Sequence, residues 1–541
     1  MRAMRSRKLL LGAVLALALP MGLAAQQTTS RASRQDQVAE QYRIFTAALA
    51  AVEQEYVEKL ESEKLVYGAI EGMLRTLDPH SSFLDPRQYA QMRERQSGQY
   101  FGIGVSIVSP GGDVTVTSVF EHSPAHRAGI RRGDVIARIK GQDAKGWTNE
   151  QAVAELKGPK GTTVQFDVRR PGTDDLIAFT VERNQVDIPT VRASFMLPGN
   201  VGYVRLQDFS ETSNDELTTA LAKLRGEGMQ KLMLDLRDNP GGPLDQAIAV
   251  SNQFLPRGSM IVYTRGRTAN ADQDFHAEEN GDLKTPLVVL VNRNSASASE
   301  IVSGAMQDHD RGLVVGETTF GKALVQSVYR ISNQSGLALT TGRYYTPSGR
   351  LIQRPWDGSF DEYLTYTLRS QQEAREHNPA ELKYTDAGRK VYGGGGVEPD
   401  RFFGGPVEGF DPTRFSRMLM GRGLFIGFAE RYKAAGDARP GSRSSRQDLA
   451  RGFSVTDQML ADFKKYVTDE RVRMDEASFA KDEAFIRAMI RYEIDVDLFG
   501  TEEARRNLVS ADPQARFAQT LFDEATRLSQ LSKTVASGGA R

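Results

Sequence analysis

Three serines and one lysine stand where they could act as a nucleophile and its base. They are Ser295, Ser297 and Ser299, with Lys322 further along the chain. The serines follow the apolar run Pro286–Val291 and open a helical pattern, so they lie where a buried strand turns into a helix. Unsatisfied N–H groups at a helix start favour an oxyanion. A helix cap and an exposed glycine turn are the simpler interpretations of the serines and the lysine taken singly.

Composition restricts which base such a serine could use. The chain has no cysteine, and none of its six histidines belongs to a triad motif such as GxSxG. A serine hydrolase built from this chain would therefore use a lysine base. A lysine takes a proton only as the neutral amine, so burial must lower its pKa from near 10.4 by about 3, at a cost of about 4 kcal/mol. The apolar neighbours Phe320, Leu324 and Val325 could provide that burial.

The motifs around these residues resemble those of one peptidase family. SASASE, AMQD and TFGKxxVQ, with DLRxNPGG upstream, are similar to motifs of the carboxyl-terminal processing (tail-specific) proteases, which are serine peptidases with a Ser-Lys dyad and an embedded PDZ domain. The resemblance implies that Ser297 is the nucleophile and Lys322 the base. It further implies that Gln326 orients the lysine amine and that Asp308 is a supporting acid. Ala323 stands where the family usually has glycine. The backbone there must therefore adopt a conformation that a residue with a side chain allows.

A glycine pair follows a second buried-strand pattern, Lys231–Leu236. The resemblance implies that Gly241 or Gly242 donates a backbone N–H to the oxyanion, beside the amide of Ser297. A plain strand-to-helix turn is the simpler interpretation. Repeated strand, turn and helix units predict an α/β core over residues 187–405. The resemblance relates this core to the Clp protease and crotonase folds.

Residues 101–186 change to a pattern of short strands. The order of SPA, AGI and GDVI motifs behind a glycine-containing loop resembles a PDZ domain, which predicts a mainly-β domain inserted before the core. Successive N–H groups of such a loop bind an anionic chain terminus, and the neighbouring strand edge accepts a peptide. The expected partners are proteins or peptides with free C-terminal tails. The residues of the expected binding loop are Gly102, Ile103, Gly104 and Val105.

The two ends of the chain predict a cellular location and two helical regions. Residues 1–26 carry basic residues before the apolar run Leu9–Leu19, which predicts a signal peptide and a periplasmic or exported protein. An uncleaved anchor in the inner membrane is the alternative. Amphipathic patterns predict a helical region at 30–100 and a helical extension at 406–541. Their apolar stripes suit core packing or contacts between copies of the chain, as in a homo-oligomer.

Charge and motif content argue against several classes of partner. The 69 basic and 69 acidic residues leave no net charge, which argues against binding to nucleic acid. The sequence contains no zinc spacing, Walker loop or EF-hand pattern. No metal and no cofactor is therefore expected.

Two functional hypotheses remain open. The first is an exported serine endopeptidase that recognises C-terminal tails through its PDZ domain, with activity gated by PDZ occupancy or by an adaptor or activator. The alternative is a non-catalytic periplasmic PDZ scaffold or chaperone, which would bind tails without turnover. A histidine-dependent, trypsin-like peptidase would need a GNSGG-type loop, and the sequence has none.

Overall fold

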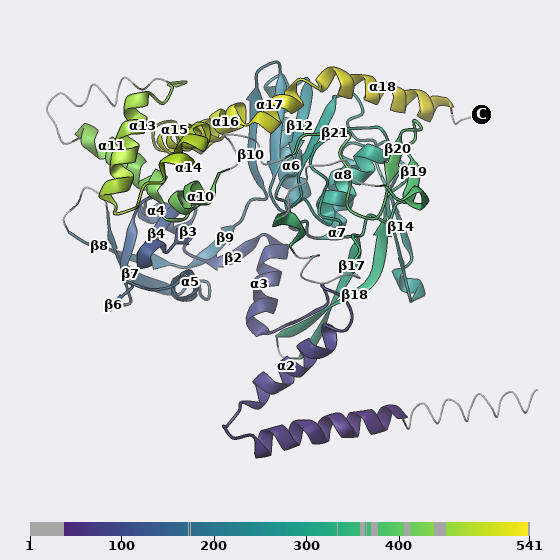
Figure 1. The fold of residues 1–541 in the computed structure, drawn as a ribbon, viewed down its shortest axis with the longest axis horizontal. Coiled ribbons are helices and arrows are strands. Elements are labelled where there is room, and N and C mark those ends of the chain that lie inside the picture. Colours follow the sequence, from purple (N-terminus) through teal and green to yellow (C-terminus); the bar gives the residue numbers. More distant parts are fainter. Residues whose placement is uncertain are drawn as a thin grey trace, which may run out of the picture.

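The computed structural model describes residues 37–541 except 171–172, 174, 333, 357–362, 364, 369–376, 405–411, 438–448, 450 and 539–541. The predicted signal peptide at residues 1–26 lies outside the described part of the chain. Among the helices of that part, none combines the length and hydropathy that a membrane crossing requires. Figure 1 shows a sheet-containing core, a smaller β domain beside it, and a helical region next to the β domain.

Six strands form the central sheet in the order β10-β11-β12-β15-β16-β21. All neighbours are parallel except the antiparallel pair β10 and β11. Every residue of β15 is buried, as expected for a strand covered on both faces. The strands are β10 Val191–Leu197, β11 Val201–Leu206, β12 Lys231–Asp235, β15 Leu287–Val291, β16 Leu313–Gly316 and β21 Arg401–Phe402.

Helices cover both faces of this sheet. On one face, α6 (Ser213–Gly226), α7 (Leu244–Asn252) and α8 (Ala298–Asp308) pack against alternate residues of the strands. On the other face, the strands pack against α17 (Pro513–Gln519) and α18 (Phe522–Gly538), which lie along the top of the sheet in Figure 1. The helices on this second face therefore come from a segment about 200 to 320 residues beyond the strands they cover, a separation typical of non-local packing.

A second, five-stranded sheet borders the core and includes a strand from the N-terminal region. β18 is its central strand and pairs with β17, β1 and β13. The strands are β1 Ser82–Leu84, β13 Met260–Gly266, β14 Gln273–His276, β17 Leu324–Ser332 and β18 Ser335–Tyr345. Two helices flank β1, namely α2 Ser62–Leu74 and α3 Pro86–Ser97, and residues 37–55 are also helical.

The β domain is a sheet in the order β3-β4-β5-β7-β8, with β6 on β5. Because β3 stands at the end of this order, one of its edges has no neighbouring strand in the described part of the chain. The paired strands β2 and β9 lead into and out of the domain. The elements are β2 Gln99–Gly102, β3 Val105–Val108, β4 Val114–Val119, α4 Pro124–Ala128, β5 Val135–Ile139, β6 Gln142–Asp143, α5 Asn149–Leu156, β7 Thr163–Arg169, β8 Ile177–Glu182 and β9 Asn184–Asp187.

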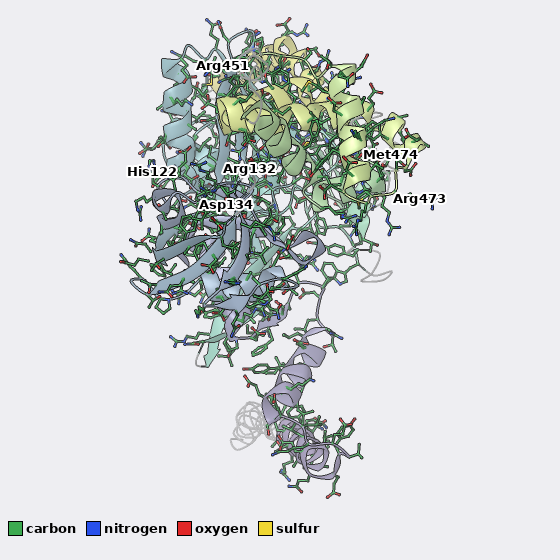
Figure 2. All side chains as sticks on the ribbon, turned by 90° about the vertical axis from the view of Figure 1, so that its left-hand side faces the viewer. His122, Arg132, Asp134, Arg451, Arg473 and Met474 are labelled. Atoms are coloured by element: carbon green, nitrogen blue, oxygen red, sulfur yellow. The ribbon has the colours of Figure 1, made fainter. Side chains whose placement is uncertain are left out.

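A helical region after the core has its own aromatic cluster and contacts the β domain. Phe425, Phe463 and Phe479 are buried inside it. Arg132 of the β domain forms an ion pair with Glu493, and their side chains are 15% and 8% exposed. Figure 2 shows Arg132 where the β domain meets these helices. The helices are α10 Arg414–Gly421, α11 Leu424–Asp437, α13 Asp457–Asp469, α14 Glu476–Lys481, α15 Glu483–Phe499 and α16 Thr501–Ala511.

Candidate active site

The three serines at the start of α8 have different environments. Ser295 is buried and donates through Oγ to the Leu236 carbonyl at 2.8 Å. Ser299 is also buried and donates to the Asn239 carbonyl at 3.0 Å. Ser297 is half-buried and has φ 56° and ψ −114°, a strained conformation for a residue with a side chain. A strained serine at a strand-to-helix turn is the geometry that exposes a nucleophile, so the structure favours Ser297.

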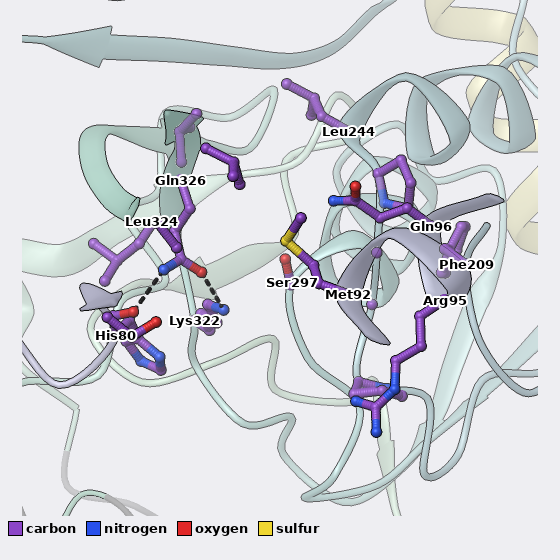
Figure 3. Close-up of a pocket in the computed structure, with 18 of the residues that line it drawn as sticks. His80, Met92, Arg95, Gln96, Phe209, Leu244, Ser297, Lys322, Leu324 and Gln326 are labelled. Carbon is purple, nitrogen blue, oxygen red and sulfur yellow. Dashed lines mark hydrogen bonds between the residues drawn. The ribbon is translucent and has the colours of Figure 1, made fainter. Parts of the chain in front are cut away.

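The amine of Lys322 is held on a short chain of hydrogen bonds. Its Nζ donates to Gln326 Oε1 at 2.9 Å, and Gln326 Nε2 donates to the His80 carbonyl at 2.7 Å. Figure 3 shows both bonds. Burial lowers the pKa of Lys322, while the carboxylates of Glu300 and Asp78 oppose that shift. The neutral, proton-accepting amine is therefore easier to reach than in an exposed lysine.

Ser297 and Lys322 line one cavity of about 770 Å³. No hydrogen bond joins the two side chains within the described residues. Figure 3 shows them with Met92 of α3 around this cavity. Its walls come from α3, from β17 and from the turn at Pro240–Pro243. Apolar lining residues include Phe83, Leu84, Met92, Phe209, Leu244, Ile301, Leu324, Val325, Val328 and Tyr344.

Glu300 ties the backbone of the serine to the backbone of the lysine. Its Oε2 accepts from the amides of Ser297 at 2.8 Å and Lys322 at 2.9 Å. Its Oε1 accepts from Thr319 Oγ1 at 2.5 Å and the Gly321 amide at 2.7 Å. Burial raises the pKa of Glu300 to about 7, although these four hydrogen bonds favour the carboxylate. No role was predicted for Glu300 from the sequence, although the S-x-x-E spacing from Ser297 is a capping-box signal that points to it.

The three amides predicted to bind the oxyanion differ in their availability. The Ser297 amide donates to Glu300, and the Gly241 amide donates to Asn239 Oδ1 at 2.9 Å. The expectation that these two amides are free donors does not hold in this structure, because each already has an acceptor. The Gly242 amide has no acceptor among the described residues, and Gly242 lines the cavity.

Asp308 and Ala323 lie in structural positions. Asp308 forms a buried ion pair with Arg350 and accepts from the Ser348 amide at 3.0 Å. It is at the far end of α8 from Ser297 and is not among the residues that line the described cavity, so it holds the loop after β18 rather than the reacting groups. Ala323 is fully buried with a negative φ, and therefore its site does not need glycine.

The ring of His80 lies beside the lysine, which sequence analysis did not anticipate. Asp78 accepts from the amides of His80 and Ser81, both at 2.8 Å, and so forms the turn that carries the ring. Nε2 of His80 bonds to the Tyr363 hydroxyl at 2.7 Å. Burial and the nearby charge of Lys322 lower the pKa of His80 to about 4, although Asp78 opposes the shift. The imidazole is therefore neutral at pH 7 and shields the lysine from water.

His80→Ala is expected to shift the pH profile of the site upward. Water entering beside Lys322 would restore part of the solvation of its ammonium and raise its pKa. A rise of about one pKa unit would lower activity at pH 7 about tenfold. The measurement is a pH–rate profile beside that of His126→Ala, which changes an exposed histidine of the β domain. An unchanged midpoint in His80→Ala would contradict this role.

A second, small groove lies between β3 and α5 of the β domain. Of the predicted loop, Ile103, Gly104 and Val105 line it, whereas Gly102 ends β2. Gly104 has φ +87°, and a Cβ there would come within 2.2 Å of Ser123 Cβ, so only glycine fits. The groove is lined by Tyr100, Ile103, Gly104, Val105, Ile107, Val153, Leu156 and Lys157.

Lys157 connects this groove to the helix that borders the catalytic cavity. Its Nζ bonds to Glu94 Oε2 of α3 at 2.5 Å and lies 4.5 Å from the centre of the Tyr100 ring. Met92 and Arg95, on the same helix, line the catalytic cavity. A single helix therefore borders both sites.

Comparison with known proteins agrees with this arrangement. Residues 200–357 match peptidase family S41, residues 91–169 match the PDZ domain, and residues 16–87 match the activating protease CtpB N-terminal domain. The chain is 39% identical over 308 residues to the carboxy-terminal-processing protease of Bartonella bacilliformis, covering 56% of this chain and 70% of that protein. It is 33% identical over 348 residues to the carboxy-terminal processing protease CtpA of Bacillus subtilis, covering 64% of this chain and 72% of that protein.

The photosystem II D1 C-terminal processing protease is 34% identical and matches 57% of this chain and 89% of its own, with a TM-score of 0.32.

Proposed function

Because the chain belongs to the carboxy-terminal processing proteases of peptidase family S41, we propose that Ser297 and Lys322 are the catalytic dyad of this serine peptidase. Membership confirms the predicted enzyme class, the PDZ domain and the α/β core. The relation to Clp protease and crotonase folds stays a prediction. The observation that carries the proposal is that a strained serine and a half-buried lysine of lowered pKa line one cavity.

The proposed reaction is acyl transfer in two halves. The neutral Lys322 amine takes the proton of Ser297 Oγ as the oxygen attacks the peptide carbonyl, and the ammonium then protonates the leaving amine. In the second half, Lys322 takes a proton from water as the water attacks the acyl carbonyl. The ammonium returns that proton to Ser297 Oγ as the acyl–oxygen bond breaks and the new carboxyl terminus leaves. Gln326 holds the amine, since its Oε1 accepts from Nζ. We assign oxyanion stabilisation to the Gly242 amide, the predicted donor that has no acceptor in the described part of the chain.

Turnover of an unstructured reporter protein with an apolar C-terminal tail tests this proposal. The parent chain and Ser510→Ala, which changes an exposed serine of α16, should cleave it, and Ser297→Ala should not. Cleavage by Ser297→Ala would overturn the assignment of the nucleophile. Tail binding without cleavage by the parent would instead favour the non-catalytic scaffold.

PDZ domains bind peptide C-termini, and we propose that this groove selects substrates by their free tails. The unpaired edge of β3 can accept the tail as an added strand, while Val153 and Leu156 face an apolar last residue. Lys157 lies in the same groove and can attract the terminal carboxylate.

Glu94→Gln is expected to tighten binding of a tail peptide about threefold to fivefold. The change releases the Lys157 ammonium for the peptide carboxylate, and a surface ion pair contributes up to about 1 kcal/mol. Fluorescence anisotropy with a labelled peptide measures the affinity, and Lys157→Ala should weaken it. Glu182→Gln, at an exposed position of β8, is the matched control. Equal affinity of Glu94→Gln and the parent would contradict the competition.

Occupancy of the groove is further proposed to gate cleavage. The Lys157–Glu94 pair joins the groove to α3, so a tail that takes Lys157 removes one of the contacts that hold α3 beside the catalytic cavity. Turnover of a short, tail-free peptide should rise when a non-cleavable tail peptide fills the groove. Unchanged turnover with confirmed tail binding would contradict gating.

Export to the periplasm is also a proposal, supported by the basic and apolar residues of positions 1–26. N-terminal sequencing of the protein from fractionated cells would distinguish a cleaved signal from an inner-membrane anchor. Recovery of the unprocessed chain in the cytoplasm would contradict both.

A further inference from the structure

The guanidinium of Arg237 lies between the catalytic turn and the C-terminal helices. Its Nη1 forms an ion pair with Asp512 Oδ2 at 2.6 Å and donates to Gln514 Oε1 at 2.8 Å. The side chains of Arg237 and Asp512 are only 10% and 15% exposed. Asp512 and Gln514 lie outside residues 200–357, which match the peptidase family.

The opposite edge of this guanidinium is bound just as firmly. Nε and Nη2 of Arg237 donate to Asp235, with distances of 3.0 Å and 2.7 Å to its two carboxylate oxygens. Asp235 is fully buried at the end of β12 and also accepts from the Tyr203 hydroxyl at 2.6 Å. With acceptors on both edges, the planar guanidinium has one orientation.

The turn that begins at Arg237 supports the nucleophile directly. The Asn239 carbonyl accepts from the Ala296 amide at 3.0 Å. Gly241 packs so closely that a Cβ there would be 2.7 Å from Ser297 Cβ. The same turn carries Gly242, the assigned oxyanion donor. A shift of Arg237 would therefore move the surface on which Ser297 rests.

We propose that Asp512, assisted by Gln514, is a positioning residue of the peptidase: it holds Arg237 and thereby the turn 237–242 against Ser297. The proposal rests on the assigned dyad. Through this contact the C-terminal segment forms part of the active-site support, in addition to covering the sheet.

A purely structural role for Asp512 makes a different prediction. Asp512 is also the N-cap of α17 and accepts from the Gln514 amide at 2.9 Å. Asp475 caps α14 in the same manner, accepting from the Ser478 amide at 3.0 Å, and α14 packs within the separate helical cluster. Asparagine caps helices as well as aspartate does. The pair Asp512→Asn and Asp475→Asn therefore separates loss of the ion pair from loss of a cap.

The experiment measures kcat and KM of the full chain on the reporter protein, together with amide hydrogen exchange of residues 238–242. Asp512→Asn should lower kcat about 10-fold to 100-fold with KM within about twofold, as expected for a small misplacement of reacting groups. Exchange in the turn should be faster, and Asp512→Glu should recover part of kcat. Asp475→Asn should change neither quantity. Gln514→Ala, which removes one acceptor, should give a smaller loss and decides the question if Asp512→Asn does not fold.

Parental kcat and parental exchange in Asp512→Asn would overturn the proposal. An equal loss in Asp475→Asn would also overturn it, because the effect would then come from general destabilisation. The exchange measurement needs no turnover. A parent chain that fails to cleave would therefore count against the dyad, while faster exchange in Asp512→Asn would still support the positioning contact.

Discussion

Lys322→Ala abolishes cleavage of the reporter protein, with an expected fall in kcat of about 10³-fold or more. Two neighbours of Lys322 cannot replace it as the base: His80 is neutral but bonded through Nε2 to the Tyr363 hydroxyl, and Gln326 cannot take a proton. Lys322→Met should lose activity equally while keeping or raising the melting temperature, because an apolar side chain replaces a buried amine. Circular dichroism checks the fold, and steady-state kinetics measure the loss. Appreciable turnover by Lys322→Met would contradict the proposal that Lys322 is the base.

The lowered pKa of Lys322 predicts how activity and stability change with pH. Because the pKa of Lys322 is lowered from 10.5, activity should rise with pH through the lowered value as the amine becomes neutral. Between that value and 10.5 the unfolded chain binds more protons, so the free energy of unfolding rises with pH in this window. Below the lowered pKa this contribution to stability is lost. Lys322→Met should remove it from a pH series of urea unfolding.

Glu300→Gln is expected to lower kcat about 100-fold. An amide offers one acceptor oxygen where the carboxylate offers two, so the new NH₂ group would face two of the four donors that now bind Glu300. The backbones of Ser297 and Lys322 would separate, and misplacement of reacting groups costs rate steeply. Glu279→Gln, at an exposed position, is the control. A parental kcat in Glu300→Gln would contradict the role of this carboxylate.

Glu300 also makes the free energy of unfolding depend on pH, but in the direction opposite to that of Lys322. Its pKa is raised from 4.5 to about 7 by burial, so between these values the native state binds more protons than the unfolded state. The stabilisation is complete below pH 4.5 and is lost as pH rises through about 7. Relative to Glu300→Gln, the parent should lose about 3 kcal/mol of unfolding free energy between pH 4 and pH 8. Urea unfolding at both pH values measures the difference.

The resemblance of short motifs to a known family was sufficient to select Ser297, Lys322 and Gln326 as candidates, whereas spacing alone left three serines open. The acceptors that the Ser297 and Gly241 amides have in this structure could not be predicted in this way. The assignment of the oxyanion donors stays a prediction. Glu300 could have been found from its spacing to Ser297.

Contacts between distant parts of the chain could not be predicted from patterns in the sequence. The His80 carbonyl meets Gln326, which is 246 positions away. Amphipathic stripes predicted helices in residues 406–541, but a stripe does not identify the surface it covers. That α17 and α18 would cover the central sheet was therefore not foreseeable. The predicted domain limits remain predictions.

The position of α17 and α18 has a consequence for the order in which the chain becomes a peptidase. Strands β10 to β16 leave the ribosome long before residues 513–538, and until then Phe195, Val288 and Leu290 have no helix over them. The ion pair between Arg237 and Asp512 likewise cannot form until Asp512 has been synthesised. We expect a nascent chain halted at residue 500 to bind chaperones and to cleave nothing, and an active, soluble truncation would contradict this. On this expectation, proteolytic competence arises only after residues 513–538 have been synthesised.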